Sequence, residues 1–450
     1  MRDSSLTGIS DRMIRAALAA ADPRAAVRQS LSQIDLPAGL SVVAVGKAAG
    51  PMAGAALETL GPRVRECLAV MPHGYPQEIG TGDTSVSLPR VTVFHAGHPV
   101  PDEAGLEAAR RVVALVDEMQ EADRCVLLLS GGGSSLLPAP LPGISLGEKI
   151  ETTDLLLRSG ADIVEINTVR RHLSVAKGGR LAERCRGAIL TLAVSDVVGD
   201  LPEAIASGPT VADPSTFADA LSVLARCGLL DRVPLPVREA LDAGRAGKIP
   251  ETPKELPERF AFRIIASNRN AVDAAAGEAR RCGFAPLVLT TPLSGEAREA
   301  GRMMAGVVME VLEKRSPVRA PACIIAGGET TVTVSGHGLG GRNQEIALSA
   351  AIHLRGCPGI QLTSFATDGV DGISGAAGGC ISGDTVPRGM SAGLDPQDCL
   401  GRNDSFAFLS AAGALVSIGP TGTNVNDLTF ALIQKGARHG RADRSTVRNR

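Results

Sequence analysis

The 450-residue chain has no tryptophan, one tyrosine and nine phenylalanines, so aromatic residues make up only 2% of it. Nucleic-acid bases are usually held by stacking on aromatic rings, and this scarcity argues against such a surface. The charges nearly cancel, with 46 Lys+Arg against 48 Asp+Glu. A balanced chain has no basic footprint for nucleic acid or for an anionic membrane, and we expect neither as a partner.

Features of redox, membrane and secreted proteins are also missing. No two of the nine cysteines lie closer than 19 positions, so there is no CxxC pair for zinc or for thioredoxin-type chemistry. No run of 18 apolar residues exists, which excludes a membrane-spanning helix. The first residues, MRDSSLTGISDRM, are polar where a signal peptide would be apolar. These absences favour a cytoplasmic protein with reduced thiols.

Hydrophobic residues, at 44%, are numerous enough for a large core, and they occur as short runs that alternate with helical patterns. Alternation of strands with helices of about 10–15 residues predicts βαβ units, with mostly parallel sheets covered by helices on both faces. The proline-rich stretch 247–260 is a linker or a long surface loop, and the chain after it is more β-like. Strands are expected at 42–45, 67–70, 91–95, 125–130, 188–196, 263–268, 286–290, 323–328, 331–334, 360–368 and 408–418, and helices at 10–20, 48–60 and 106–116.

Glycine is the residue in excess, with 52 copies, and the clearest glycine loop follows the strand at 125–130. Its sequence is Ser130, Gly131, Gly132, Gly133, Ser134 and Ser135. Three glycines allow the backbone N–H groups to form a concave cradle for an anion, and the serines add hydroxyl donors. A plain turn between strand and helix is the alternative. The loop is neither a Walker A motif nor the GxGxxG of a dinucleotide-binding turn.

Charged residues stand at other strand ends. Lys47 directly follows the strand at 42–45, a position that points into the ligand crevice of an open α/β sheet. Asp196 follows the strand at 188–196, where a carboxylate can hold Mg²⁺, take a proton from a hydroxyl or simply cap a helix. Asn167 and Lys177 flank a short basic helix and its glycine stop, and both are candidates for binding substrate.

The second half carries a matching set of polar strand ends. Arg342 stands where the glycine-rich stretch 338–341 opens a helix, which suits a phosphate or carboxylate oxyanion. Asn268 and Glu329 follow two further strands and are candidates for phosphate or substrate binding, and Asp368 is a second candidate for Mg²⁺. Polar, glycine-rich loops at strand ends, together with one or two lysine or arginine side chains, are typical of an enzyme that binds small phosphorylated ligands.

Eight segments resemble the class of glycerate 2-kinases whose C-terminal half is called the MOFRL domain. They run in order from about residue 41 to 428: VGKAAGPMA, GHPVPDEAG, LLLSGGGSSLLPAP, EINTVRRHLSVAKGGRLA, SDVVGDLPEAIASGP, GGETTVTVSGHGLGGRNQE, ATDGVDG and GPTGTNVNDL. The resemblance implies ATP-dependent phosphorylation of D-glycerate at its 2-hydroxyl. It also implies that a lysine and an arginine are the catalytic cations, carried onto Lys47 by VGKAAG and onto Arg342 by GGRNQE.

The resemblance further implies an α/β protein with a Rossmann-like, doubly wound N-terminal domain and a second α/β domain of the MOFRL type, with the active site in the cleft between them. We expect the first domain at residues 1–250, the second at 258–436, and a disordered basic tail at 437–450. ATP and D-glycerate are the expected small-molecule ligands, with Mg²⁺ as the metal. The sequence leaves open whether the chain forms a homo-oligomer and which residue, if any, is the general base.

Two other functions are compatible with a chain of this class. Proteins that resemble this family have also been called hydroxypyruvate reductases, an activity that requires a nicotinamide cofactor. No GxGxxG follows a strand with an acidic residue about 20 positions on, which argues against that activity. A non-catalytic sensor of a sugar acid or a nucleotide is the third hypothesis, and the number of charged strand ends argues against it.

Overall fold

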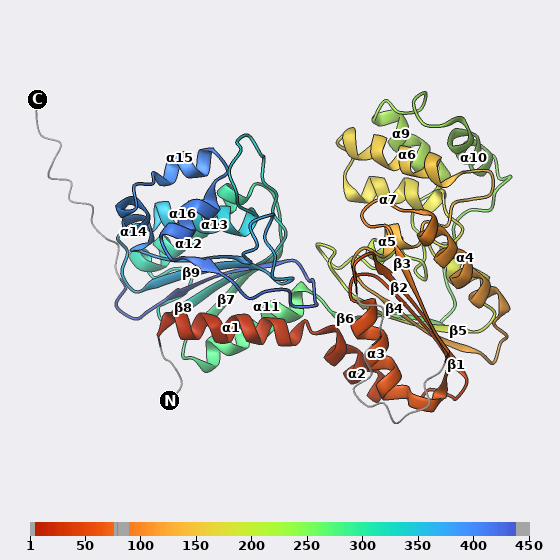
Figure 1. The fold of residues 1–450 in the computed structure, drawn as a ribbon, viewed down its shortest axis with the longest axis horizontal. Helices are drawn as coiled ribbons and strands as arrows, with labels where there is room; N and C mark the ends of the chain where they lie inside the picture. Colours follow the sequence, from red (N-terminus) through yellow and green to blue (C-terminus); the bar gives the residue numbers. More distant parts are fainter. Residues whose placement is uncertain (1–4, 76–78, 80–89, 438–450) are drawn as a thin grey trace, which may run out of the picture. The chain divides into compact units, whose positions relative to one another are not determined.

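The computed structural model describes residues 5–75, 79 and 90–437. They form two compact units (Figure 1). The N-terminal unit is Pro23–Ile265, and the C-terminal unit joins the segment ending at Asp22 to the chain from Ala266 onward. This division differs from the expected N-terminal domain, 1–250, at both of its ends. The helix at residues 6–20 belongs to the C-terminal unit, and the last strand of the N-terminal sheet, at residues 260–266, lies in the range expected for the second domain. Of the expected tail, residues 438–450 lie outside the described part.

The N-terminal unit is built on a six-stranded sheet with the order β3-β2-β1-β4-β5-β6. β1 pairs in parallel with both β2 and β4, β2 with β3, and β4 with β5. This is the strand order of a doubly wound nucleotide-binding fold, as expected. The strands are β1 (Leu40–Val45), β2 (Val64–Pro72), β3 (Arg90–Ala96), β4 (Arg124–Leu129), β5 (Ala188–Val194) and β6 (Phe260–Ala266).

Helices cover this sheet because its central strands are apolar on both faces, and every residue of β1 is buried. The sheet helices include α3 (Ala49–Leu60) and α4 (Glu103–Glu118), which pack on β1 to β3. A separate helical layer, formed by segments that follow β4 and β5, has its own apolar core (Figure 1). Its helices are α6 (Leu146–Arg158), α7 (Ile163–His172), α9 (Phe217–Arg226) and α10 (Leu235–Arg245), and the remaining elements are α2 (Pro23–Ser32), η1 (Gly61–Arg63), α5 (Gly133–Leu136), α8 (Arg180–Arg184) and η2 (Ile205–Ser207).

The C-terminal unit has a second six-stranded sheet, with the order β11-β10-β9-β12-β8-β7. Only β7 and β8 pair in parallel, whereas β12 is antiparallel to both β8 and β9, and β10 is antiparallel to β9 and β11. The expectation of a mostly parallel sheet is therefore wrong for this unit. Its strands are β7 (Ala285–Leu293), β8 (Ala322–Gly328), β9 (Ile360–Ala366), β10 (Gly378–Ser382), β11 (Leu415–Val416) and β12 (Asp427–Ile433).

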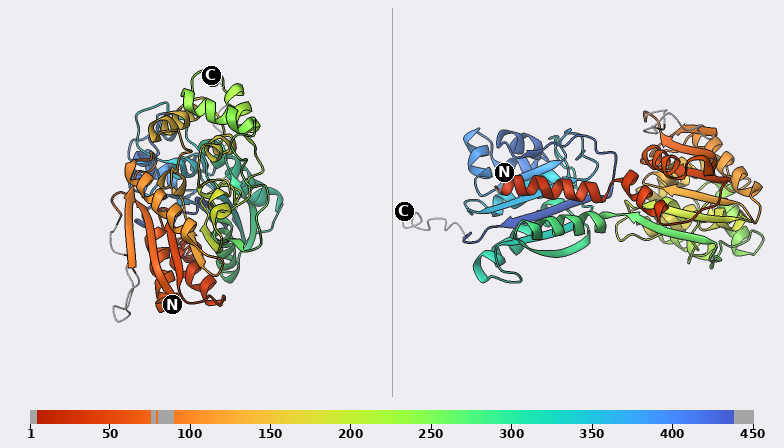
Figure 2. Two further views of the ribbon diagram at one scale, coloured as in Figure 1. Left: turned by 90° about the vertical axis from the view of Figure 1, so that its right-hand side faces the viewer. Right: turned by 90° about the horizontal axis from the view of Figure 1, so that it is seen from below.

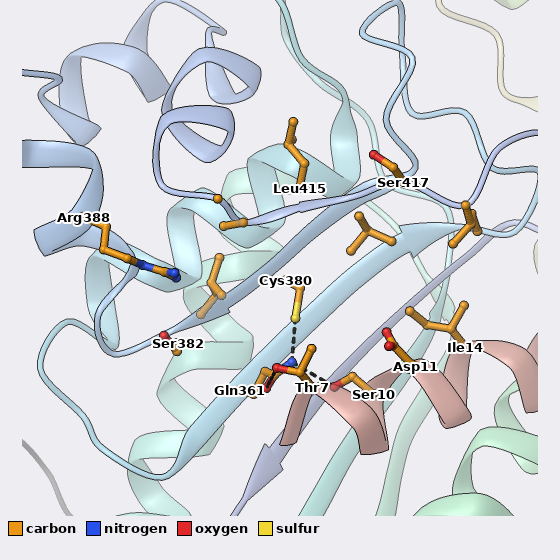
Figure 3. Close-up of a pocket in the computed structure, with 15 residues that line it drawn as sticks. Thr7, Ser10, Asp11, Ile14, Gln361, Cys380, Ser382, Arg388, Leu415 and Ser417 are labelled. Atoms are coloured by element: carbon orange, nitrogen blue, oxygen red, sulfur yellow. Dashed lines mark hydrogen bonds between the residues drawn. The ribbon is translucent and has the colours of Figure 1, made fainter. Parts of the chain in front are cut away.

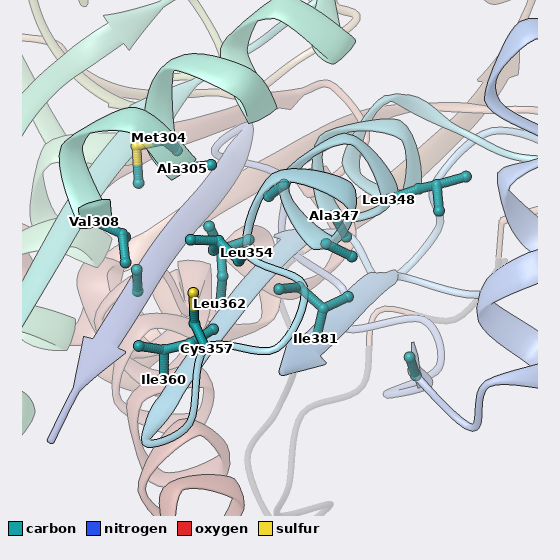
Figure 4. Close-up of a cluster of buried hydrophobic side chains, with 14 of the residues drawn as sticks. Met304, Ala305, Val308, Ala347, Leu348, Leu354, Cys357, Ile360, Leu362 and Ile381 are labelled. Carbon is teal, nitrogen blue, oxygen red and sulfur yellow. The ribbon is translucent and has the colours of Figure 1, made fainter. Parts of the chain in front are cut away.

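Two helical layers enclose this sheet. α12 (Ala297–Lys314) packs against α13 (Arg342–His353), and Figure 4 shows their apolar side chains meeting those of β9 and β10, such as Leu362 and Ile381. The N-terminal helix α1 (Leu6–Ala20) lies along α11 (Asn268–Arg281) and touches β9 (Figures 1 and 2). The short helices are α14 (Thr385–Ser391), α15 (Pro396–Gly401) and α16 (Ser405–Ala411). Among the described residues of both units, no helix is long and apolar enough to cross a membrane.

One of the expected strands is absent and another is mostly helix and loop. In 331–334 only Thr331 makes a β-bridge, and the rest is loop. Most of 408–418 differs as well, since its first residues end α16 and only Leu415–Val416 pair as β11. Short apolar runs without a long period are ambiguous between a buried helix and a strand. The stretch 247–260 is a surface loop that leads into β6, and not a linker between the units.

Candidate active site

The order of the N-terminal sheet reverses between β1 and β4. From β1 the chain moves outward to β2 and β3, and from β4 it moves the other way to β5 and β6. In open α/β sheets, ligands bind at such a reversal, outside the carboxyl ends of the strands. Lys47 lies just after β1, Ser130 just after β4, and Asp196 just after β5. The structure therefore brings three predicted site segments to one edge of one sheet.

The loops after β1 and β4 are bonded to each other directly. The backbone N–H of Lys47 donates to the carbonyl of Gly131 at 2.9 Å, and that of Ala48 donates to Ser130 Oγ at 3.0 Å. Gly46 has a φ of +128°, and a Cβ there would lie 2.2 Å from Ser130 Oγ. Only glycine permits this approach, because any side chain would separate the two loops.

The three glycines of the Ser130–Ser135 segment, called the glycine loop below, are each approached by a different neighbour. A Cβ on Gly131 would lie 2.0 Å from a carboxylate oxygen of Asp196. Gly132 has a φ of +84° and lies against the ring of His98, and a Cβ on Gly133 would lie 2.9 Å from the Cβ of Ala206. A plain turn would not need all three. The glycines let a carboxylate, an imidazole and a methyl group come within contact of one backbone segment.

Asn167 and Lys177 are linked to the glycine loop by hydrogen bonds. Lys177 bonds to Ser134 directly, and Asn167 is linked to Ser134 through Ser207. Lys177 Nζ donates to the carbonyl of Ser134 at 2.8 Å and to its hydroxyl at 3.2 Å. The hydroxyls of Ser134 and Ser207 are 2.8 Å apart, and Ser207 Oγ donates to Asn167 Oδ1 at 2.9 Å. Asn167, Lys177 and Ser207 are almost fully buried. They support the loop from inside the protein.

Ser207 was not predicted as a site residue, and its backbone sets it apart. It has a φ of +61°, next to Ala206 at +51°. Two consecutive non-glycine residues in the left-handed region carry strain that the surrounding contacts must offset, and such strain is concentrated at functional sites. In the sequence, the Ser-Gly-Pro at 207–209 predicts a turn, and it ends one of the segments that resemble the family.

Burial changes the protonation of two groups beside the glycine loop. Burial, with a smaller effect from the Arg170 charge, lowers the pKa of Lys177 to about 7. His98 Nδ1 lies 2.8 Å from Ser135 Oγ, and burial followed by the charge of Lys47 lowers the pKa of this imidazole. Both shifts favour the neutral form, so near neutral pH this side of the loop carries less positive charge than its composition indicates.

In the C-terminal unit, Arg342 opens α13 and is held by two carboxylates. Its Nη2 lies 2.8 Å from Asp427 Oδ1 and 3.4 Å from Glu329 Oε1. Asp427 is almost fully buried at the start of β12, and burial raises its pKa to about 6 in spite of the arginine. Asp427 was not predicted as a partner of Arg342, because it lies 85 positions further along the chain.

The start of α13 is capped by a carboxylate from another loop. Asp371 Oδ1 accepts from the backbone N–H of Asn343 at 3.1 Å, and its Oδ2 accepts from that of Gln344 at 2.9 Å. A Cβ on Gly341 would lie 2.3 Å from the Asp371 carboxyl carbon. This cap places the first turn of the helix, and with it Arg342.

Asn268 and Asp368, the other predicted residues of this unit, have hydrogen-bond partners within the unit. The side-chain amide of Asn268 donates to the carbonyls of Val425 and Asp427 at 2.8 and 3.0 Å, which ties α11 to the start of β12. Asp368 Oδ1 accepts from the N–H of Val370 at 3.0 Å. Asp368 and Asp196 belong to different units. Within the described part of the chain, no three His, Cys, Asp or Glu residues form a cluster that could hold a metal ion.

A cavity of about 420 Å³ lies elsewhere in the C-terminal unit, where α1 meets β10 and β11. Figure 3 shows Gln361 between Cys380 and Ser10 in this cavity, and its amide donates to Cys380 Sγ at 2.7 Å. Burial raises the pKa of the Cys380 thiol, which makes it a poor nucleophile. None of the predicted site residues lines this cavity.

Two family models, several named proteins and solved structures are similar to this chain. A family model described as a domain of unknown function (DUF4147) matches residues 9–242, and the MOFRL family model matches residues 322–427. A Thermotoga maritima protein named D-glycerate 2-kinase is 44% identical over 95% of this chain and 99% of its own length. An Agrobacterium vitis protein named putative hydroxypyruvate reductase is 42% identical over 96% and 95%. The crystal structure of glycerate kinase from Thermotoga maritima superposes with a TM-score of 0.87, at 44% identity, covering 96% of this chain and all of that one.

Proposed function

This chain belongs to the glycerate 2-kinase family that carries the MOFRL domain, and on that premise we propose that it transfers the terminal phosphoryl group of ATP to the 2-hydroxyl of D-glycerate. One observation carries the proposal. The glycine loop and Lys47 meet at the reversal point of a sheet with the order β3-β2-β1-β4-β5-β6. That point is where doubly wound folds bind anionic ligands.

The proposed roles follow from the needs of phosphoryl transfer. The reaction requires alignment of the two substrates and compensation of charge on the transferring group, with little covalent work by the protein. Lys47 supplies a flexible point charge at the carboxyl end of β1, and the glycine loop offers backbone N–H groups to an anionic group of either substrate. Arg342, which the Asp427 carboxylate holds in place, offers a planar donor to phosphate oxygens.

Magnesium fits the donors at this edge of the N-terminal sheet. Mg²⁺ usually keeps several waters and takes only one or two protein carboxylates together with phosphate oxygens, so a cluster of three protein ligands is not required. Asp196, partly exposed beside the glycine loop, is the proposed ligand, and Asp368 of the C-terminal unit is the second candidate. The ion would supply compensation of charge on the phosphate oxygens. We also propose a reducing, cytoplasmic location, since cysteines such as Cys67, Cys125 and Cys323 are free and buried.

The experiment that tests this proposal is an assay of product identity. Purified protein with ATP, Mg²⁺ and D-glycerate should release ADP and form 2-phosphoglycerate. An enolase-coupled assay that omits phosphoglycerate mutase reports the 2-phosphate alone. Formation of the 3-phosphate, or no ADP release above that of the Lys47→Ala protein, would overturn the proposal.

The same preparation can test the reductase activity that the name of the Agrobacterium vitis relative indicates. Hydroxypyruvate with NADH or NADPH should give no change in absorbance at 340 nm. The physical reason is that the turn after β1 is closed against Ser130 Oγ, whereas a dinucleotide-binding turn leaves its backbone open to the pyrophosphate.

A further inference from the structure

The C-terminal unit has a cavity of about 490 Å³, which is larger than D-glycerate, the smaller of the two substrates, would need. It is formed by the loop that follows β8 and by the loop that follows β9. Its walls include Thr330, Val332, Val334, Arg342, Glu345 and Ile373. This volume is typical of sites for drug-sized ligands and exceeds what a three-carbon acid fills. Because Arg342 lines it, the cavity adjoins a proposed catalytic residue.

The walls of this cavity carry aliphatic side chains that the protein does not cover. Val334 is 73% exposed and Ile373 is 83% exposed. Glycerate consists of hydroxyl and carboxylate groups on three carbons and has no face to cover them. Of the two substrates, only ATP has a flat apolar surface, on its adenine ring. A chain without tryptophan and with 2% aromatic residues would have to hold that ring between aliphatic groups.

Two polar residues of the cavity wall, Thr330 and Glu345, are almost fully buried. Thr330 is 3% exposed, and among the described residues its hydroxyl has no hydrogen-bond partner. An unpaired buried hydroxyl is costly, and a ligand donor or acceptor would relieve that cost. Glu345 is also buried, and it already accepts from Asn403 Nδ2 at 2.7 Å and from Arg298 Nη2 at 3.0 Å. Its position is therefore fixed before any ligand binds.

We propose that this cavity holds the adenosine part of ATP, with the base against Val334 and Ile373 and the phosphates directed toward Arg342. The inference rests on the proposed kinase activity and adds the place where the nucleoside binds. It assigns to the C-terminal unit the recognition of the nucleotide, and it gives Thr330 a partner on the base or the ribose.

Serine substitutions in the cavity wall test this assignment. Val334→Ser and Ile373→Ser remove the aliphatic cover, and each should raise the KM for ATP about tenfold while leaving kcat and the KM for D-glycerate within twofold. Leu339→Ser is the matched control, because Leu339 lies in the same loop and is 45% exposed but does not line the cavity. A rise in the KM for D-glycerate alone, or equal effects in the control, would overturn the proposal.

A binding measurement separates failure of this inference from failure of the kinase proposal. Adenosine and inorganic tripolyphosphate are titrated separately into the wild-type protein and the two cavity variants by calorimetry. Adenosine should bind the wild type and lose at least tenfold in affinity with each variant, while tripolyphosphate binding should not change. If adenosine binds all proteins equally or none of them, the cavity assignment is wrong. Because no turnover is needed, this result holds even if D-glycerate is not the acceptor.

Discussion

The two units hold their proposed catalytic cations in opposite ways. Among the described residues, Lys47 makes no ion pair, whereas Arg342 is bound to Asp427 and Glu329. A cation without a counterion has its full charge available to an arriving phosphate. A paired guanidinium has much of its charge compensated already, but its orientation is fixed before the substrate binds. The comparison indicates that Lys47 acts mainly through charge and Arg342 mainly through geometry.

The largest expected effect comes from removing either cation. Lys47→Ala and Arg342→Ala should each lower kcat by about 10²–10³, the usual cost of losing a group that stabilises charge in a transition state. Steady-state kinetics with ATP and D-glycerate measure the loss, and circular dichroism checks the fold. Lys248→Ala and Arg302→Ala, which change exposed cations of the same two units, should retain full activity. A folded variant with nearly wild-type kcat would show that the residue changed, Lys47 or Arg342, has no catalytic role.

Conservative exchanges sharpen the contrast between charge and geometry. Lys47→Arg keeps the charge and should retain at least a tenth of the activity. Arg342→Lys also keeps the charge but cannot make two parallel bonds to Asp427, and we expect it to be nearly as inactive as Arg342→Ala, roughly 10²-fold down. The ratio of the two kcat values is the readout. Equal loss in both exchanges would contradict the division of roles.

A methyl group in the glycine loop should have the next largest effect. Gly131→Ala places a Cβ 2.0 Å from the Asp196 carboxylate, which must move, and activity should fall at least tenfold, or about 1.4 kcal/mol in the barrier. Gly147→Ala is the control, because its Cβ would meet nothing closer than 3.9 Å. Kinetics at several Mg²⁺ concentrations should show a raised Mg²⁺ requirement for Gly131→Ala alone. An unchanged Mg²⁺ requirement would argue against Asp196 as the metal ligand.

The buried Lys177 should give the N-terminal unit a dependence of stability on pH. Burial lowers its folded-state pKa to about 7 from 10.5, so between these values the unfolded chain binds one proton more than the folded chain. Stability therefore rises with pH from about 7 to about 10, and this gain is absent below pH 7. Urea midpoints across this range should show the slope in wild type and a flatter slope in Lys177→Met. Lys248→Met, an exposed control, should keep the wild-type slope.

The smallest effect is expected from the hydroxyl that links Ser134 to Asn167. Ser207→Ala removes one hydrogen bond at each end, which should cost about 0.5–1.5 kcal/mol in stability per bond and lower activity only a few-fold. The free energy of unfolding and kcat are the two measurements. A loss of activity as large as that of Lys47→Ala would mean that Ser207 contacts substrate itself.

The element types of the N-terminal unit could be predicted because local signals were sufficient there. β1 is a short, fully buried and mostly apolar run that ends just before Gly46, and a similar apolar run forms β4 before the glycine loop. Where the outcome depended on a distant partner, prediction failed. In the described part of the chain, residues 331–334 pair with no strand and make only the isolated bridge of Thr331 to Glu296, and Ser405–Ala411 form a helix that packs on α13. A pleated pattern without a partner strand does not make a sheet.

The sequence by itself determined which residues end the strands and what chemistry they carry, because a polar residue follows each apolar run within two positions, at Lys47, Ser130 and Asp196. Only the tertiary structure decided that Asp427 holds Arg342, that Ser207 links Ser134 to Asn167, and that α1 belongs with the C-terminal unit, where Thr423 Oγ1 donates to the carbonyl of Ala21 at 2.6 Å. These contacts join residues that lie far apart along the chain. Local propensity and periodicity contain no information about such pairs, because packing of the whole unit selects them.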